Sequence, residues 1–247
     1  MKRILLLLPF SILFFIGCVG QEPIPEDITW TFMVIDDSVR EYSLQDLSSY
    51  DSTTIVETLI EKEITKISWN GPLARLFGEG DIINFISEDG YVVSIPYEVD
   101  VILAYQKEGV PVGEEDGGPL KIIVDPYYGC KCNWLKFLKI VEFVDKEESF
   151  SVYGEVFNLI TFSYRDLNLY YGLENVIDDT NSQVPLLFIL DKALCKENAT
   201  TITFVTESGR FTYSLEEIRD IDPLLTYDDG FFIEGLGIEY LQGIKIE

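Results

Sequence analysis

The sequence predicts an α+β protein that is rich in strands, has short helices and consists of two tandem units. Three observations lead to this prediction. Alternating apolar runs flank short turn sequences, which is typical of β-hairpins. Serine residues precede short helical segments at N-cap positions. Several blocks of sequence also recur roughly 110 residues further along the chain, a spacing that indicates a repeated domain.

Short helices are predicted at four places along the 247 residues. Ser43 and Ser163 each stand where a side-chain oxygen can cap the first turn of a helix. Proline is favoured in the first turn, where its missing N–H costs nothing, and Pro72 and Pro185 occupy such positions. The four predicted helices span residues 44–47, 72–77, 164–167 and 185–193.

Strands are predicted where β-branched and aromatic residues dominate. Glu88-Asp89-Gly90 separates two such runs and predicts a hairpin, and Ser208-Gly209 predicts a second hairpin in the same way. Two further apolar runs have the length of buried strands. The predicted strands span residues 84–87, 91–95, 121–124, 135–143, 203–206 and 211–213.

The two predicted units have similar blocks in the same order. Residues 42–47 recur as residues 162–167, and residues 85–90 recur as residues 204–209. Lys136–Ile140 can be placed over Tyr240–Ile244. These matches predict a first domain over residues 29–146 and a second, shortened copy over residues 147–247, in which most of the segment corresponding to residues 110–135 is missing.

The N-terminus carries the pattern of an export signal. Lys2 and Arg3 precede an apolar run that is too short to span a bilayer as a helix. The run ends in Phe15-Ile16-Gly17-Cys18, which resembles the lipobox of prokaryotic lipoproteins. We therefore predict a signal peptide over residues 1–17, a lipidated Cys18 and a tether over residues 18–28. An uncleaved N-terminal membrane anchor is the alternative, and both place the remaining chain outside the cytoplasm, anchored to the cell membrane.

Composition excludes several kinds of chemistry. The chain has 43 acidic residues, 18 Lys and Arg residues and no histidine, so its formal net charge is −25. Without histidine it cannot use a Ser-His-Asp or Cys-His catalytic centre or a histidine-ligated metal. A surface this acidic repels phosphate backbones, which argues against nucleic acid as a partner.

The first unit resembles the oxidoreductase molybdopterin-binding domain, the catalytic fold of sulfite oxidase. The resemblance covers roughly residues 38–145. It depends on Trp69-Asn70-Gly71-Pro72-Leu73, on Gly117-Gly118-Pro119-Leu120 before an apolar strand, and on Trp134. It implies two sulfite-oxidase-like domains in tandem, the second degenerate. In such a fold the cofactor-side residues would be Gly117, Gly118, Pro119, Tyr128 and Lys131.

The sequence departs from this family where catalysis takes place. Active members hold molybdenum through a cysteine thiolate on the strand before the Trp-containing segment. Here residues 55–63 contain no cysteine, and Glu61 stands near the expected position. A carboxylate is not a soft donor. We therefore predict no catalytic residues and no cofactor, with molybdopterin as the alternative.

The remaining cysteines are Cys130, Cys132 and Cys195. A disulfide between Cys195 and either Cys130 or Cys132 would join the two units. Two alternatives are a soft-metal site made by the three thiolates and a redox-active Cys-x-Cys pair, in which Lys131 lowers the pKa of a neighbouring thiol. Molybdenum bound through Cys130 or Cys132 would instead make the chain an oxidoreductase.

The sequence as a whole predicts a binding or scaffold protein that is not an enzyme. Its predicted partners are the membrane, through the lipid on Cys18, and an unknown protein or a small anionic ligand. Cations are concentrated in one region, which contains Lys121, Lys131, Lys136, Lys139 and Lys146. These lysines can face an anion, although strand alternation places Lys136 and Lys139 on opposite faces.

Overall fold

The computed structural model describes residues 24–25, 28–60, 64–128, 131–163 and 183–247, with the side chain of Cys132 excepted. The predicted signal peptide, Cys18, Cys130 and the predicted helix over residues 164–167 lie outside the described residues. Within the described ranges, no helix is long and apolar enough to cross a membrane. Ile24 and Ile28, at the end of the predicted tether, pack against the core of the first half.

A five-stranded sheet forms the centre of the first half, with the order β2-β1-β11-β5-β6. Its strands are β1 Thr31–Ile35, β2 Val39–Ser43, β5 Ile82–Ser87, β6 Val92–Pro96 and β11 Leu138–Val144. β1 is parallel to β11, and the other neighbours are antiparallel. The hairpin predicted around Glu88-Asp89-Gly90 is confirmed as β5 and β6. The strand predicted over residues 135–143 begins three residues late, at Leu138.

The second half contains a sheet with the same arrangement, in the order β13-β12-β19-β15-β16. Its strands are β12 Ser149–Gly154, β13 Ile160–Ser163, β15 Thr201–Thr206, β16 Gly209–Ser214 and β19 Leu241–Ile246. β12 is parallel to β19, and the other neighbours are antiparallel. The predicted boundary at residue 146 falls in η4 (Lys146–Glu148), the 3-10 turn between β11 and β12.

The strand pairing corrects one detail of the sequence comparison. Phe85 on β5 pairs with Val141, and Phe204, the matching residue on β15, pairs with Ile244. Val141 therefore corresponds to Ile244, so the placement of Lys136–Ile140 over Tyr240–Ile244 is wrong by one residue. A shift of one residue moves every side chain of a strand to the other face of the sheet.

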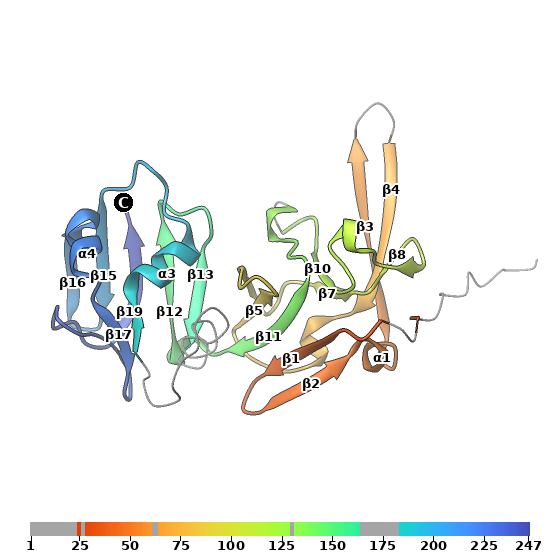
Figure 1. Cartoon of the computed structure of the whole chain (residues 1–247), viewed down its shortest axis with the longest axis horizontal. Helices are drawn as coiled ribbons and strands as arrows, with labels where there is room; N and C mark the ends of the chain where they lie inside the picture. The colour runs from red at the N-terminus through yellow and green to blue at the C-terminus, as the bar shows by residue number, and fades with distance from the viewer. Residues whose placement is uncertain (1–23, 26–27, 61–63, 129–130, 164–182) are drawn as a thin grey trace, which may run out of the picture.

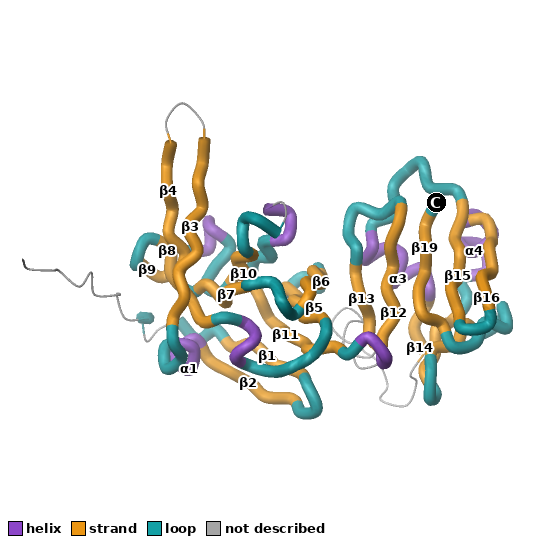
Figure 2. Tube along the Cα trace, turned by 180° about the vertical axis from the view of Figure 1, so that it is seen from behind, coloured by secondary structure: helices purple, strands orange, loops and turns teal. Residues whose placement is uncertain are grey.

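The remaining strands of the first half form two smaller layers (Figure 1). β7 Val101–Ala104 pairs with β10 Lys121–Val124. β3 Ser52–Ile60, β4 Ile64–Pro72, β8 Gln106–Lys107 and β9 Val110–Pro111 form a four-stranded sheet in that order. In Figures 1 and 2 the β3–β4 hairpin projects away from the rest of the first half.

Helices are short in both halves. α1 (Leu44–Leu47) is capped by Ser43, as predicted, and α3 (Leu186–Ala193) follows Pro185, as predicted. The helix predicted over residues 72–77 is wrong, because Pro72 ends β4 and only a 3-10 turn, η1 (Ala74–Leu76), follows it. The other elements are η2 (Glu114–Asp116), η3 (Lys131–Asn133), α4 (Leu215–Ile221), β14 (Gln183–Pro185), β17 (Leu224–Tyr227) and β18 (Phe231–Ile233).

Apolar side chains fill the space between these layers in three clusters. One lies between the first sheet and the β7–β10 pair, and contains Val34, Phe85 and Leu103. A smaller one lies on the other face of that pair, where Ile102 packs with Trp69. The third joins the halves, because Ile35, Ile86, Val92 and Ile140 of the first sheet belong to the same cluster as the core of the second half.

Candidate anion-binding site

Five residues of the first half form what we call the lysine–tryptophan cluster: Trp69, Trp134, Lys107, Lys121 and Lys131. The two indole rings meet edge to face, with centroids 6.2 Å apart. Lys121 Nζ lies 4.8 Å from the centroid of Trp69 and 5.8 Å from that of Trp134. Lys107 Nζ lies 5.5 Å from Trp69, and Lys131 Nζ lies 5.7 Å from Trp134. Each cation is within the range in which an aromatic face attracts it.

Strand alternation explains how a lysine comes to lie in this apolar layer. Ile122 and Val124 on β10 point into the larger core of the first half, whereas Ile123 points into the smaller cluster beside Trp69. Since side chains on a strand alternate between faces, Lys121 shares the face of Ile123. Its stem is therefore buried beside the indoles, and only 6% of Lys121 is exposed.

The ammonium of Lys121 is held in an environment that disfavours its charge. Its Nζ donates a hydrogen bond of 3.0 Å to the backbone carbonyl of Asp116. Burial lowers the pKa of Lys121, and the nearby charge of Lys136 lowers it further, whereas Asp116 and Glu57 act in the opposite direction. A buried cation beside like charges gains from a counterion, so this position favours an anion.

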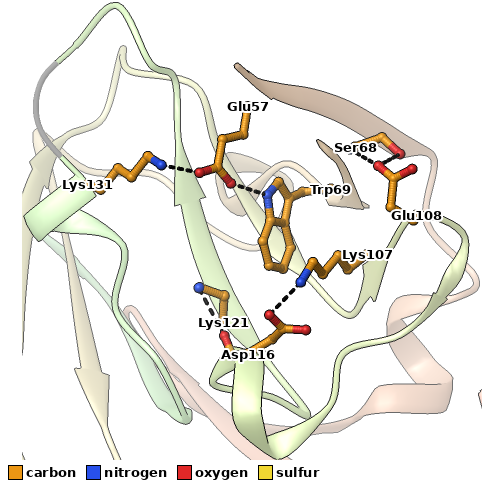
Figure 3. A network of polar contacts seen from close by, with 8 residues as sticks. All are labelled: Glu57, Ser68, Trp69, Lys107, Glu108, Asp116, Lys121 and Lys131. Carbon is orange, nitrogen blue, oxygen red and sulfur yellow. Dashed lines mark hydrogen bonds and ion pairs between the residues drawn. The ribbon is translucent and has the colours of Figure 1, made fainter. Parts of the chain in front are cut away.

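Glu57 on β3 closes one side of the cluster (Figure 3). Its Oε2 accepts a hydrogen bond of 3.0 Å from Trp69 Nε1, and its Oε1 forms an ion pair with Lys131. Glu57 is 7% exposed, so its charge is almost removed from water. This carboxylate fixes the ring of Trp69 and offsets the charge of Lys131.

Asp116 closes the other side. Its Oδ1 forms an ion pair of 2.5 Å with Lys107 Nζ, and its carbonyl accepts the bond from Lys121. The next residue after Lys107, Glu108, instead turns to Ser68, whose backbone N–H and hydroxyl both donate to it. Asp116 thus positions two lysines of the cluster through two different oxygens.

The loop Gly117-Gly118-Pro119 lies beside the cluster, but its glycines face the protein itself. Gly117 has φ +89°, and a Cβ there would overlap the side chain of Lys136. A Cβ on Gly118 would overlap the backbone carbonyl of Val112. On the side where a Cβ would point, the two glycines are therefore packed against Lys136 and Val112. Gly118–Pro119 is a cis peptide bond. The cofactor-side role of this loop stays a prediction.

The structure brings together some of the predicted site residues and separates others. Lys121 and Lys131 lie in the cluster, and Lys136 adjoins it at Gly117. Lys139 lies elsewhere, with its Nζ 3.5 Å from the centroid of Trp30. Tyr128 lies in a turn, where its backbone N–H donates to the carbonyl of Asp125. Among the described residues, no contact joins Tyr128 to the cluster.

The cysteines lie in different parts of the chain. Cys195 forms no disulfide with a described residue. Its thiol donates to the carbonyl of Leu190 at 3.7 Å, and burial raises its pKa. Cys130 and the side chain of Cys132 lie outside the described residues, so the disulfide and the three-thiolate site stay predictions. Among the described residues, no group of three or more Cys, Asp or Glu side chains is placed to hold a metal ion.

The sequence alone does not place three residues at this site. Glu57 and Lys107 are far from the lysine-rich region in sequence, and only the pairing of β4 with β3 and β8 brings them to Trp69. Trp69 was noted only as part of a family pattern. A lone glutamate in an otherwise β-branched strand is the one signal in the sequence that pointed to Glu57, because such a residue is rarely buried without a partner.

Residues 20–153 match the oxidoreductase molybdopterin binding domain family. Among solved structures, the chain is similar to the sulfane dehydrogenase SoxCD from Paracoccus pantotrophus, with 16% identity and a TM-score of 0.38. The match covers 46% of this chain and 37% of that chain. No curated protein matches this chain. Because the family match covers more than half of the sequence, the chain belongs to the oxidoreductase molybdopterin-binding domain family.

Proposed function

We propose that this protein is an extracytoplasmic lipoprotein, anchored to the membrane through Cys18, which binds a small anion at the lysine–tryptophan cluster and catalyses no reaction. The observation that carries the proposal is the convergence of Lys107, Lys121 and Lys131 on two indole rings in a chain of net charge −25. Lys121 is buried, and its ammonium has a backbone carbonyl as its hydrogen-bond partner, so a bound anion would stabilise its charge.

The donor set does not fit the molybdenum centre that the family resemblance implies. No cysteine lies between Cys18 and Cys130 in the sequence, so β3 and β4 offer the metal no thiolate. The carboxylate of Glu57 is already engaged by Trp69 and Lys131. On the side where a Cβ would lie, Gly117 and Gly118 are packed against the protein's own atoms. These facts support a binding role for the fold rather than an oxidoreductase role.

The proposal includes a second, shortened copy of the domain in the second half. It is supported by the two five-stranded sheets, which have the same strand order and the same strand directions. Phe137 and Tyr240, which directly precede β11 and β19, also share a left-handed backbone with φ 52°. Non-glycine residues rarely adopt this conformation, so its recurrence at matching positions favours duplication.

Anion binding is testable through the fluorescence of the cluster itself. The chain has three tryptophans, and Trp30→Phe leaves only Trp69 and Trp134. In this background we expect sulfate or phosphate to change the emission in a saturable manner, and Lys121→Gln to weaken binding about tenfold, as loss of one charged hydrogen bond predicts. Lys139→Gln is the control, because Lys139 lies over Trp30 outside the cluster. Equal weakening by both changes would contradict the proposed site.

The absence of catalysis has a separate test, which is elemental analysis and pterin fluorescence of the protein purified from its native host. We expect neither molybdenum nor tungsten in stoichiometric amounts. Stoichiometric metal with pterin would instead establish a molybdopterin oxidoreductase, with Cys130 or Cys132 as the source of the thiolate. Zinc or copper without pterin would establish a soft-metal site at Cys130, Cys132 and Cys195.

The lipid anchor is testable by mass spectrometry of the N-terminal peptide. We expect cleavage before Cys18 and a mass increase from the attached lipid. Cys18→Ser should abolish the mass increase from the attached lipid, while Cys195→Ser, the matched cysteine change, should leave it unchanged. An N-terminal peptide that retains Met1 would contradict both cleavage and lipidation.

A further inference from the structure

The strand β3 forms one edge of its four-stranded sheet, and its far side carries no strand among the described residues. It is nine residues long, Ser52–Ile60, and pairs along its whole length with β4. The hairpin that it forms projects from the first half (Figures 1 and 2). Val56 and Ile60 are 46% and 79% exposed. A long edge strand with exposed apolar side chains is a template for another strand.

Backbone groups of alternate β3 residues point out from this edge. On β4, the carbonyls of Ser68 and Asn70 accept bonds from the backbone of Glu108 and Tyr105, away from β3. Trp69, between them, therefore directs its N–H and C=O toward its β3 partner, Ile55. The β3 residues on either side of Ile55 therefore direct their N–H and C=O groups away from β4. Among the described residues, the outward-pointing donors and acceptors of Thr54, Val56 and Thr58 have no strand to bond to.

Natural proteins protect such edges, and this molecule protects another of its own. On β13, also an edge strand, the N–H of Thr161 donates to Ser94 Oγ at 2.9 Å, and its carbonyl accepts from Asn84 Nδ2 at 2.8 Å. β3 has no such cover among the described residues, and no lysine or proline interrupts it. Unlike the edge of β13, the edge of β3 is therefore available for pairing with another strand.

A cleft of about 480 Å³ runs beside β3. Thr53–Val56 and Thr58 line one wall, and Asp100, Asp125, Pro126 and Tyr127 line the other. The described lining includes two carboxylates and no lysine or arginine. Tyr127 is 99% exposed, so its ring is free to cover whatever enters. Asp100 already forms an ion pair of 2.5 Å with Arg75, so Asp125 is the carboxylate of this wall that favours a basic occupant. The net charge of −25 opposes a second copy of the chain.

We propose that the free edge of β3 binds an extended, basic segment of a partner protein, which adds an antiparallel or parallel strand to the sheet. Backbone hydrogen bonds to Thr54, Val56 and Thr58 would provide affinity. A basic side chain next to Asp125 would select the partner. None of the five residues of the lysine–tryptophan cluster lines this cleft. A failure of anion binding would therefore not contradict strand pairing at β3.

The test uses the purified protein and a nine-residue peptide, Lys-Thr-Val-Thr-Val-Thr-Val-Thr-Lys, labelled for fluorescence anisotropy. Val56→Pro removes an outward N–H and leaves the bonds to β4 intact, since proline is tolerated on the open side of an edge strand. We expect it to weaken binding about tenfold or more, and Val56→Ala, which keeps the N–H, to change binding by less than about threefold. Backbone amide exchange should slow at Thr54, Val56 and Thr58 when the peptide binds.

Charge is tested by changes that leave the edge untouched. Asp125→Asn keeps the oxygen that accepts from the Tyr127 N–H at 2.9 Å but removes the charge, and should weaken peptide binding and its salt dependence. Replacing the terminal lysines of the peptide with glutamate should weaken binding further. Equal binding by Val56→Pro and Val56→Ala, or no binding by the peptide, would overturn the proposal. Dimerisation of the protein that Val56→Pro abolishes would assign the edge to a second copy, which would also overturn it.

Discussion

The hydroxyl of Ser163 on β13 donates a hydrogen bond of 2.5 Å to the carboxylate of Glu142 on β11. Glu142 is fully buried, and its other oxygen accepts a bond of 3.0 Å from Asn84 Nδ2. The same Asn84 amide reaches the carbonyl of Thr161. A charge carried by the first sheet is therefore satisfied partly by the second, so that the two halves are joined by polar bonds as well as by a shared apolar cluster.

This contact predicts that the halves unfold together. Ser163→Ala leaves one oxygen of a buried carboxylate without the hydroxyl, and we expect it to lower the free energy of unfolding by about 1–3 kcal/mol. Urea denaturation followed by circular dichroism measures this loss. Glu41→Gln, at an exposed position on β2, is the control and should change little. Two separated transitions in the unaltered protein would show that the halves do not depend on each other.

Local elements were predictable from the sequence because their causes are local. Ser43 caps α1, and the turn residues Glu88-Asp89-Gly90 join β5 to β6, as expected. The failures have a different cause. Pro72 was assigned to a helix because proline suits a first turn, but pairing with Ser52 holds it at the end of β4. Tertiary pairing overrides local propensity in such cases.

The candidate site was only partly predictable for the same reason. Lys121 and Lys131 stood out because cations are scarce in this chain. Their convergence depends on Trp69 and Glu57, which β-sheet pairing over long sequence separation brings to them. Adjacent glycines indicate that some group lies close to the backbone at Gly117 and Gly118, but the sequence does not identify that group. The approaching groups are Lys136 and Val112.

The hydrogen bond between Glu57 and Trp69 should contribute more to stability than the ion pair between Glu57 and Lys131. Glu57→Gln keeps an oxygen that accepts from Trp69 Nε1 and loses only the ion pair with Lys131, whose side chain is 55% exposed. Such pairs contribute about 0–1 kcal/mol, so we expect a small loss of stability. Glu57→Ala leaves the buried indole N–H without its acceptor and should cost about 1–3 kcal/mol. Thermal or urea unfolding distinguishes the two, and equal losses would contradict this division.

Gly117 and Gly118 should tolerate no side chain. Gly117→Ala combines an unfavourable φ of +89° with overlap against Lys136, and Gly118→Ala brings Cβ against a backbone carbonyl that cannot rotate away. Gly109 provides the matched control, since its φ is +83° but no atom lies within 4 Å of a Cβ built there. We expect Gly109→Ala to cost about 1 kcal/mol and each of the other two clearly more. Equal destabilisation of all three would contradict the close packing of the loop.

The lowered pKa of Lys121 predicts opposite effects of pH on stability and on anion binding. Between that lowered pKa and the ordinary value of 10.5, the unfolded chain binds more protons than the folded chain, so the free energy of unfolding should rise with pH. An anion needs the charged ammonium, so sulfate affinity should fall over the same window. Urea unfolding and sulfate titration across this range measure the two trends. Lys121→Gln should remove the rise in stability and reduce the pH dependence of binding, because it removes the ammonium that loses its charge in this window. A sulfate affinity that stays constant up to pH 10.5 would exclude Lys121 as a charged partner of the anion.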